Sequence, residues 1–233
     1  MILKNEIIKE IETNLQNALI SSYKERSNAS DVFEAFVLSI IIQAAIKEGA
    51  KRPIQWENKD GVKTTNILFR RSPGYINSAS NQYTHAILDF PGVDPLELHL
   101  GIYAIGIAEV PQECDIAVVK RSEAQRCRSI TNGKVSIESR HILIGVECKC
   151  YESSKISLGL GRSFLGLVKD FSSRGKLKSQ YFFISNQTFK SVAKLLSRHD
   201  QAWAHDLTPT SNNEIEKLRN QFQSKFQQYT SSF

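Results

Sequence analysis

The segment HILIGVECKC, residues 141–150, joins an apolar run to a glutamate and a lysine. Apolar runs of this length that are rich in β-branched residues are typical of buried strands. Successive side chains of a strand point to opposite faces, so Glu147 and Lys149 share one face, while the neighbouring valine and cysteines share the other. Charges in a strand that is buried on both faces need a partner or a purpose. We interpret Glu147 and Lys149 as a candidate site; the alternative is a salt bridge at a strand end, which contributes little to stability.

A second apolar run, CDIAVVK at residues 114–120, opens with an acid, Asp115. Alone, such an acid is most simply a residue of the preceding turn. If the two strands are neighbours, however, Asp115 can meet Glu147 and Lys149. The two carboxylates and the backbone carbonyl of Cys148 would then provide the hard oxygen ligands that magnesium and manganese prefer. Lys149 could orient or help deprotonate a water beside the metal, and its charge could stabilise a phosphate.

Asp115 in ECDIAVV and Glu147-Cys148-Lys149 in LIGVECKCY, with the order of the expected helices and strands, resemble the PD-(D/E)xK nucleases and their restriction-endonuclease-like fold. The resemblance covers about residues 31–186. It implies that Asp115 and Glu147 bind the metal and that Lys149 is the catalytic lysine. The chain departs from the pattern in three ways: no proline adjoins Asp115, the gap to Glu147 is long, and no QxxxY signature follows. Within the superfamily, LHLGIYAIGIAEVPQECDIAVV is similar to small bacterial restriction- or defence-associated members.

Two further acids are candidates for the same site. Many members of the superfamily carry an acid on the helix before the sheet, and Glu34 in SDVFEAF occupies a suitable place. The alternative for Glu34 is a capping box, in which Asp31 is the N-cap and Glu34 is residue N3. Glu113 could share a face with Asp115 and is a reserve ligand, although a solvated side chain is the simpler expectation.

Basic residues are concentrated directly after the candidate site. Between residues 149 and 178 the only acids are Glu152 and Asp170, against seven bases: Lys149, Lys155, Arg162, Lys169, Arg174, Lys176 and Lys178. One interpretation is a surface for a nucleic-acid backbone formed by Lys155, Arg162 and Lys169, to which Arg70 and Arg71 could add. The alternative is a solvated helix face and a basic loop. A net charge of +6 is compatible with a polyanionic partner without requiring one.

The cysteines and histidines show no metal-binding pattern. The four cysteines lack the CxxC knuckles of structural zinc sites and the framework of a small secreted protein, so free and mostly buried thiols are expected. The five histidines show no HExxH spacing. His99, in LELHLG, could approach the site, but we expect a sheet histidine with its hydrogen bonds satisfied.

The periodicity predicts one α/β domain over residues 1–233, with N-terminal helices in 1–50, a central mixed sheet in 64–186 and a C-terminal helical segment in 187–233. Helices are expected at 2–25, 31–48 (ending before Gly49), 157–171, 188–198 and from 213. Strands are expected at 66–71, 84–90, 96–106, 114–120, 141–149 and 180–186, with a short extended AWAHDL after them. The polar stretch 121–140 is expected to be a loop or hairpin.

No membrane segment or leader is expected. The apolar segment 35–46 is too short to span a bilayer and is interpreted as a buried helix. The acids within MILKNEIIKEIE interrupt any signal-peptide apolar region. These features predict a cytoplasmic protein.

The combined expectation is a magnesium- or manganese-dependent nuclease that hydrolyses phosphodiester bonds, most simply a DNA endonuclease in restriction or defence. The chain has no helix-turn-helix or zinc finger, so targeting would come from a homodimer, a partner protein or DNA structure. The alternative is a non-catalytic nucleic-acid-binding or complex-assembly subunit that retains the fold. Such a subunit would normally have lost one of Asp115, Glu147 and Lys149. A nucleotide site at LGLGRS is disfavoured because neither phosphate-loop pattern is present.

Overall fold

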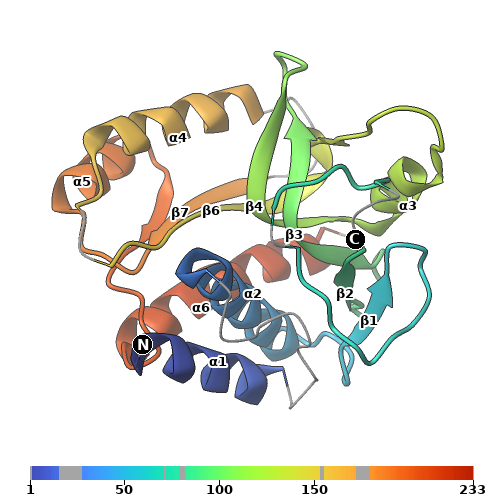
Figure 1. Ribbon diagram of the computed structural model, residues 1–233, viewed down its shortest axis with the longest axis horizontal. Coiled ribbons are helices and arrows are strands. Elements are labelled where there is room, and N and C mark those ends of the chain that lie inside the picture. Colours follow the sequence, from blue (N-terminus) through green and yellow to red (C-terminus); the bar gives the residue numbers. More distant parts are fainter. Residues whose placement is uncertain are drawn as a thin grey trace.

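The computed structural model describes residues 2–15, 28–70, 72–78, 82–152, 155–171 and 179–232 (Figure 1). The strands are β1 (Gln55–Asn58), β2 (Thr84–Leu88), β3 (Leu96–Ile105), β4 (Pro111–Lys120), β5 (Ile137–Glu138), β6 (Ile142–Lys149), β7 (Gln180–Ser185) and β8 (Ala202–Ala204). The helices are α1 (Ile2–Asn14), α2 (Ala29–Lys47), α3 (Arg121–Ser129), the 3-10 turn η1 (Ser139–His141), α4 (Leu158–Phe171), α5 (Lys190–Arg198) and α6 (Asn212–Thr230).

Within the described ranges, the strands form one eight-stranded mixed sheet in the order β1-β2-β3-β4-β6-β7-β8, with β5 beside β3. Neighbours from β1 to β6 along this order pair antiparallel, whereas β6 pairs parallel with β7, and β7 with β8. Parallel neighbours need a crossover, and α4 and α5 supply the two crossovers. The expected α/β fold with a mixed sheet flanked by helices is therefore confirmed.

Helices cover both faces of the sheet (Figure 1). On one face α1, α2 and α6 enclose one core cluster, and on the other α4 and α5 enclose a second, to which α3 also contributes. Helix α2 is apolar on nearly its whole surface and is central to the first cluster. By length and composition α2 could cross a membrane, but 72% of its most apolar 18-residue stretch is buried inside the protein, as in a core helix.

The pairing between β4 and β6 ends partway along both strands. Its last pair is Ile116 with Val146, yet β4 continues beside β3 to Pro111 and β6 continues beside β7 to Lys149. The pairing of β3 with β4 is also interrupted at this level, because Gly101 and Asp115 are not paired with each other. Gly101 has a φ of +56°, a left-handed backbone conformation that glycine adopts more readily than other residues. Beyond these residues the β3–β4 hairpin no longer pairs with β6, and it projects away from β6 and β7 (Figure 1). We call the resulting opening the β4–β6 fork.

Several sequence predictions need correction. The described part of the strand expected at 66–71, residues 66–70, forms no strand: Ile67 and Phe69 are buried, but the backbone is irregular apart from a single bridge at Ile67, and Leu68 bonds to Thr84. The alternation of apolar and polar residues in this segment therefore arises because an irregular segment places Ile67 and Phe69 in the core. The stretch 121–140, expected to be a loop or hairpin, contains helix α3 and strand β5 instead.

The limits of the sheet also differ from the prediction of 64–186. Strand β1 precedes them and β8 follows them. Helix α2 begins at Ala29, with Asn28 as its N-cap, so Asp31 lies within the first turn and the expected capping box is wrong. The end of α2 is as predicted, because Gly49 has a φ of +102° just beyond it. Part of the helix expected at 2–25 falls outside the described residues.

Candidate functional site

The fork brings Asp115 to the ExK strand. Asp115 is buried on β4, just beyond the last β4–β6 pair, and its Oδ2 accepts a hydrogen bond of 2.7 Å from the backbone N–H of Cys148. A regular ladder would give this N–H to a backbone carbonyl of β4; here a carboxylate takes it. Asp115 is thereby fixed against the strand segment that carries Glu147 and Lys149.

Glu147 and Lys149 form an ion pair at the open side of the fork. Lys149 Nζ lies 2.5 Å from Glu147 Oε1, and each side chain keeps about a fifth of its surface exposed, 23% and 22% respectively. The predicted alternation holds, because Val146 and Cys148 lie in the core on the α2 side. The two charged side chains are consequently available to a ligand, and the Cys148 thiol is not.

Cys148 contributes through its backbone. Both polar groups of one strand residue point toward the same neighbour, so its carbonyl faces the fork together with its N–H. The thiol is buried in the core, and burial raises its pKa well above the ordinary value, with the nearby Asp115 carboxylate adding to the shift. The sulfur of Cys148 therefore packs in the core, and the backbone of this residue faces the fork.

Helix α2 brings Glu34 toward Asp115 from the other side. Burial raises the pKa of Glu34 to about 9, and repulsion by Asp115 and Asp31 adds to the shift. Its Oε1 accepts a 3.4 Å hydrogen bond from the hydroxyl of Ser30. With the capping-box alternative removed, Glu34 is a half-buried acid whose pKa is shifted by Asp115 and Glu113 of the fork.

The acids of the fork repel one another. Burial and then Glu147 raise the pKa of Asp115 to about 7, against the opposing effects of Lys149 and the Cys148 N–H. Burial and Glu147 also raise the pKa of Glu113. Burial alone would lower the pKa of Lys149, but Glu147 and Asp115 outweigh it and raise the value. Lys149 is the one cation among the described groups that shift the pKa values of these acids, so the acids outnumber the cations and retain protons to higher pH than free carboxyl groups do.

The acids do not yet form a closed metal site. Among the described residues, Glu34, Asp115 and Glu147 do not bring three ligand atoms within 4.8 Å of one another. Glu147 is turned to Lys149 instead. To bind a cation here, the Glu147 side chain would have to rotate away from Lys149 and toward the ion. The side chain is partly exposed, so the rotation does not require the core to repack.

The predicted nucleic-acid residues divide into two groups. Lys155, Arg162 and Lys169 are exposed, and the latter two lie seven residues apart on one face of α4. Arg70, by contrast, is 7% exposed; its guanidinium lies 3.8 Å from the ring centroid of Tyr83 and donates to the carbonyl of Tyr75. Arg71 lies outside the described residues. Arg162 and Lys169 are thus exposed on α4, whereas Arg70 makes internal contacts.

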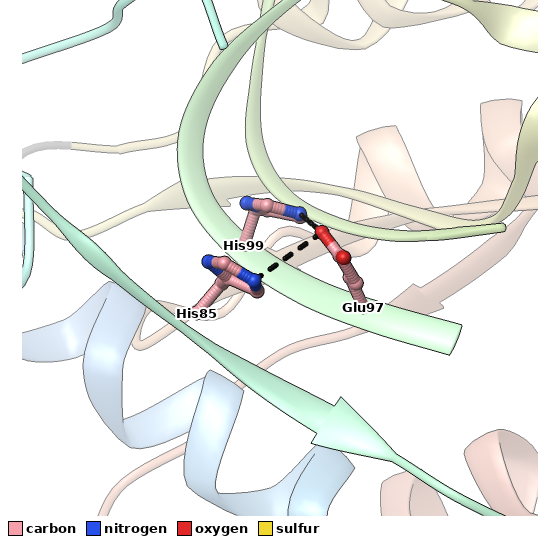
Figure 2. Close-up of side chains that lie close together, drawn as sticks. All are labelled: His85, Glu97 and His99. Carbon is pink, nitrogen blue, oxygen red and sulfur yellow. Dashed lines mark hydrogen bonds and ion pairs between the residues drawn. The ribbon is translucent and has the colours of Figure 1, made fainter. Parts of the chain in front are cut away.

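A second polar cluster, which the sequence reasoning missed, is formed by residues of β1, β2, β3 and α3, and its histidines and glutamates are buried. Figure 2 shows three of its members, His85, Glu97 and His99. His85 and His99 both direct Nε2 to Glu97 Oε2, at 3.4 and 3.0 Å, and their rings are stacked with centroids 4.8 Å apart. Arg128 holds both oxygens of Glu97, at 2.5 and 2.7 Å. Arg121 holds both oxygens of Glu57, each at 2.9 Å. We call these six residues the ion-pair network.

The ligand atoms of His85, Glu97 and His99 lie within 4.8 Å of one another, so a metal could be considered. Two features oppose this. The imidazole planes are only 18° from parallel, so their in-plane lone pairs do not converge on one ion. Arg121 and Arg128 already neutralise Glu57 and Glu97, so a further cation would add uncompensated buried charge. The network is a structural clamp that fixes α3 to the sheet.

Part of this network was visible in the sequence. LELHLG alternates polar and apolar residues, which places Glu97 and His99 on one face. The partners were not visible, because Glu57 lies in the unpredicted strand β1, and the two arginines lie in a helix predicted as a loop. His99 is only partly satisfied: Nε2 contacts Glu97, whereas the buried Nδ1 has no hydrogen-bond partner within the described structure.

Comparisons with protein-family models, with curated proteins and with solved structures found no match to this chain.

Proposed function

We propose that the chain is a metal-dependent nuclease that hydrolyses phosphodiester bonds, most simply a DNA endonuclease, with the restriction-endonuclease-like arrangement of the PD-(D/E)xK superfamily. One observation carries this proposal. The carboxylate of Asp115 is bonded to the backbone of Cys148, in the middle of the Glu147–Lys149 pair, although the residues come from two strands that part at this level.

The donor set fits magnesium or manganese. Carboxylates of Asp115 and Glu147 and the carbonyl of Cys148 are hard oxygen ligands, and Glu34 could add a fourth from α2. Burial and then repulsion between neighbouring acids raise the pKa values of Asp115 and Glu34, and Lys149 offsets only part of the shift. When bound, a divalent ion would lower the pKa of a water and neutralise phosphate charge.

The chain's own residues would divide the remaining work. Asp115, buried and fixed by the Cys148 N–H, keeps the ligand set in place. Lys149, once Glu147 turns away, can donate to a phosphate oxygen or to the attacking water. Its raised pKa keeps it protonated at neutral pH, so it acts as a donor and positive charge.

The substrate and setting are part of the same proposal. Exposed Arg162 and Lys169 on α4, with Lys155 before it, would contact the phosphate backbone. Targeting would come from a second copy of the chain or from a partner protein. We place the activity in the cytoplasm, away from a membrane, in restriction or defence.

The test is cleavage of plasmid DNA with magnesium or manganese by the wild type, Lys149→Ala and Glu147→Ala. We expect the wild type to nick or linearise the plasmid and both variants to lose at least about a hundredfold in rate. Glu12→Gln, at an exposed position of α1, is the control and should cut like the wild type.

Two outcomes would contradict the proposal. If both variants cut as fast as the wild type, the activity does not belong to this site. If the folded wild type binds DNA but never cuts DNA or RNA with either metal, the non-catalytic subunit is the better description.

A further inference from the structure

A pair of tyrosines lies beside the acids of the fork and belongs to neither core cluster. Tyr75, in the segment that follows Arg70, and Tyr103, on β3, have ring centroids 4.8 Å apart with a tilt of 42°. Both side chains are half-buried, and both are missing from the two groups of packed apolar residues. The exposed Lys134 places its Nζ 5.5 Å from the centroid of the Tyr75 ring. We call Tyr75, Tyr103 and Lys134 the aromatic platform.

The sheet register connects this platform to the candidate active site. Tyr103 pairs directly with Glu113 across β3 and β4, and directly opposed residues of an antiparallel pair share one face. Glu113 is close enough to Glu147 and Lys149 for both charges to shift its pKa. Tyr103 of the platform therefore lies next to Glu113, the outermost acid of the fork along β4.

The backbone holds the platform in place. Tyr103 N–H donates to the carbonyl of Gly74 at 3.2 Å, and Gly74 N–H donates to that of Gly101 at 2.9 Å. The side chain of Asn77 bonds to Ile130, Gly133 and Val135, at 2.8, 3.1 and 3.2 Å, and so fixes the loop that carries Lys134. Rings fixed before a ligand arrives lose little entropy on binding it.

We propose that the aromatic platform receives an unpaired nucleobase of the substrate strand, next to the phosphate that is cut. Aromatic faces stack with any base, and a nearby ammonium binds the adjoining phosphate. Bases inside a duplex are not free to stack on a side chain, so the preferred substrate is single-stranded or locally unpaired nucleic acid. The assignment rests on the proposed nuclease function, which it narrows to a substrate class.

The test is binding of a short labelled oligonucleotide, as a single strand and as a blunt duplex, with calcium in place of magnesium to prevent cleavage. We expect Tyr103→Ala to weaken single-strand binding by about 5- to 150-fold, the equivalent of one lost base stack. Tyr103→Phe keeps the ring and should bind within about twofold of the wild type. Duplex binding should be the same in all three proteins.

A matched control is Trp203→Ala, which removes another half-buried aromatic residue. Trp203 lies in β8, the edge strand farthest from β1, and its ring stacks on that of His205. This substitution should leave single-strand binding unchanged. Equal single-strand affinity of Tyr103→Ala and the wild type would overturn the platform, as would a wild type that binds no single strand.

Cleavage measured on the same proteins separates the two proposals. If the wild type cuts nucleic acid and the tyrosine variants bind and cut equally well, only the platform fails. If Tyr103→Ala weakens binding but no protein cuts under any metal, the platform stands and the nuclease assignment fails.

Discussion

The β4–β6 fork and the ion-pair network are both clusters of charged residues set into apolar strands, but they differ in charge balance. In the network, Arg121 and Arg128 match Glu57 and Glu97, and all four are held by close contacts. In the fork, Lys149 is the one cation among the described groups that shift the pKa values of Glu34, Glu113 and Asp115, and it is paired with Glu147. A balanced cluster is complete within the chain and stabilises the fold. An unbalanced cluster is completed from outside, which is the property expected of a site.

The largest effect is expected from breaking the balance of the network. Glu97→Gln would leave Arg128 with an uncompensated buried charge, and we expect the free energy of unfolding to fall by about 3–5 kcal/mol. Urea unfolding followed by circular dichroism measures this. Glu138→Gln, which removes a half-exposed partner of Arg140, is the control and should change stability by less than about 0.5 kcal/mol. Equal effects of the two substitutions would show that the network is not a clamp.

The fork should respond in the opposite sense, by gaining stability from an added cation. Manganese or calcium at a hundred times its dissociation constant should stabilise the wild type by about 2.7 kcal/mol, because the ion binds only the folded chain. Asp115→Asn should abolish most of this gain, whereas Glu97→Gln should keep it. Thermal unfolding with and without the metal gives the answer. A metal-induced shift lost in Glu97→Gln and kept in Asp115→Asn would place the ion in the network instead.

Acid should weaken the network through its histidines. Burial lowers the pKa of His85 to about 2 and also lowers that of His99, while Glu97 acts in the opposite direction. The charged and titratable groups that face the pair are Glu57, Glu97, Arg121, Arg128, Arg70 and Tyr83.

Since the folded pKa values lie below the unfolded value of about 6.5, the unfolded chain binds more protons as the pH falls below that value. Each histidine should then cost up to about 1.4 kcal/mol of stability per pH unit. Between pH 7.5 and 5.5 the raised pKa values of Asp115 and Glu34 act in the opposite direction, because the folded chain there binds protons that the unfolded chain does not. The histidine contribution is therefore measured as the difference in slope between the wild type and His85→Gln, which should lose less stability on acidification. An unchanged slope in this variant would mean that His85 is not held neutral.

The smallest effect is expected at the basic surface of α4. Arg162→Gln should weaken nucleic-acid binding modestly and lower the slope of log affinity against log salt by about one unit. The control is Lys194→Gln, an exposed position on α5, which should not change the slope. If both substitutions change the slope equally, the nucleic acid binds to positive charges over the whole surface, and α4 is not a preferred binding surface.

The sequence predicted the fork better than the network, for physical reasons. The period of a strand separates Glu147 and Lys149 from Cys148 without knowledge of the fold, and the apolar runs identify both strands. Whether Asp115 reaches the ExK strand depends on long-range pairing, which only the structure reports. The network escaped prediction because α3 buries few apolar side chains, chiefly Ala124 and Cys127, and is held to the sheet by charge. Its apolar signal is too weak to read as a helix.

The hydrogen bond from Cys148 N–H to Asp115 bears on how such a chain could change over evolutionary time. Under the proposed function, replacing Glu147 or Lys149 would remove reactivity and leave the backbone intact. Replacing Asp115 with an apolar residue would leave the buried N–H of Cys148 without a hydrogen-bond acceptor. The expected loss in the free energy of unfolding is about 1–3 kcal/mol. A descendant that gave up catalysis would therefore shed the glutamate or the lysine first and retain the aspartate. A related chain that retains Asp115 but lacks the Glu-x-Lys pair would therefore be expected to keep the fold without the proposed chemistry.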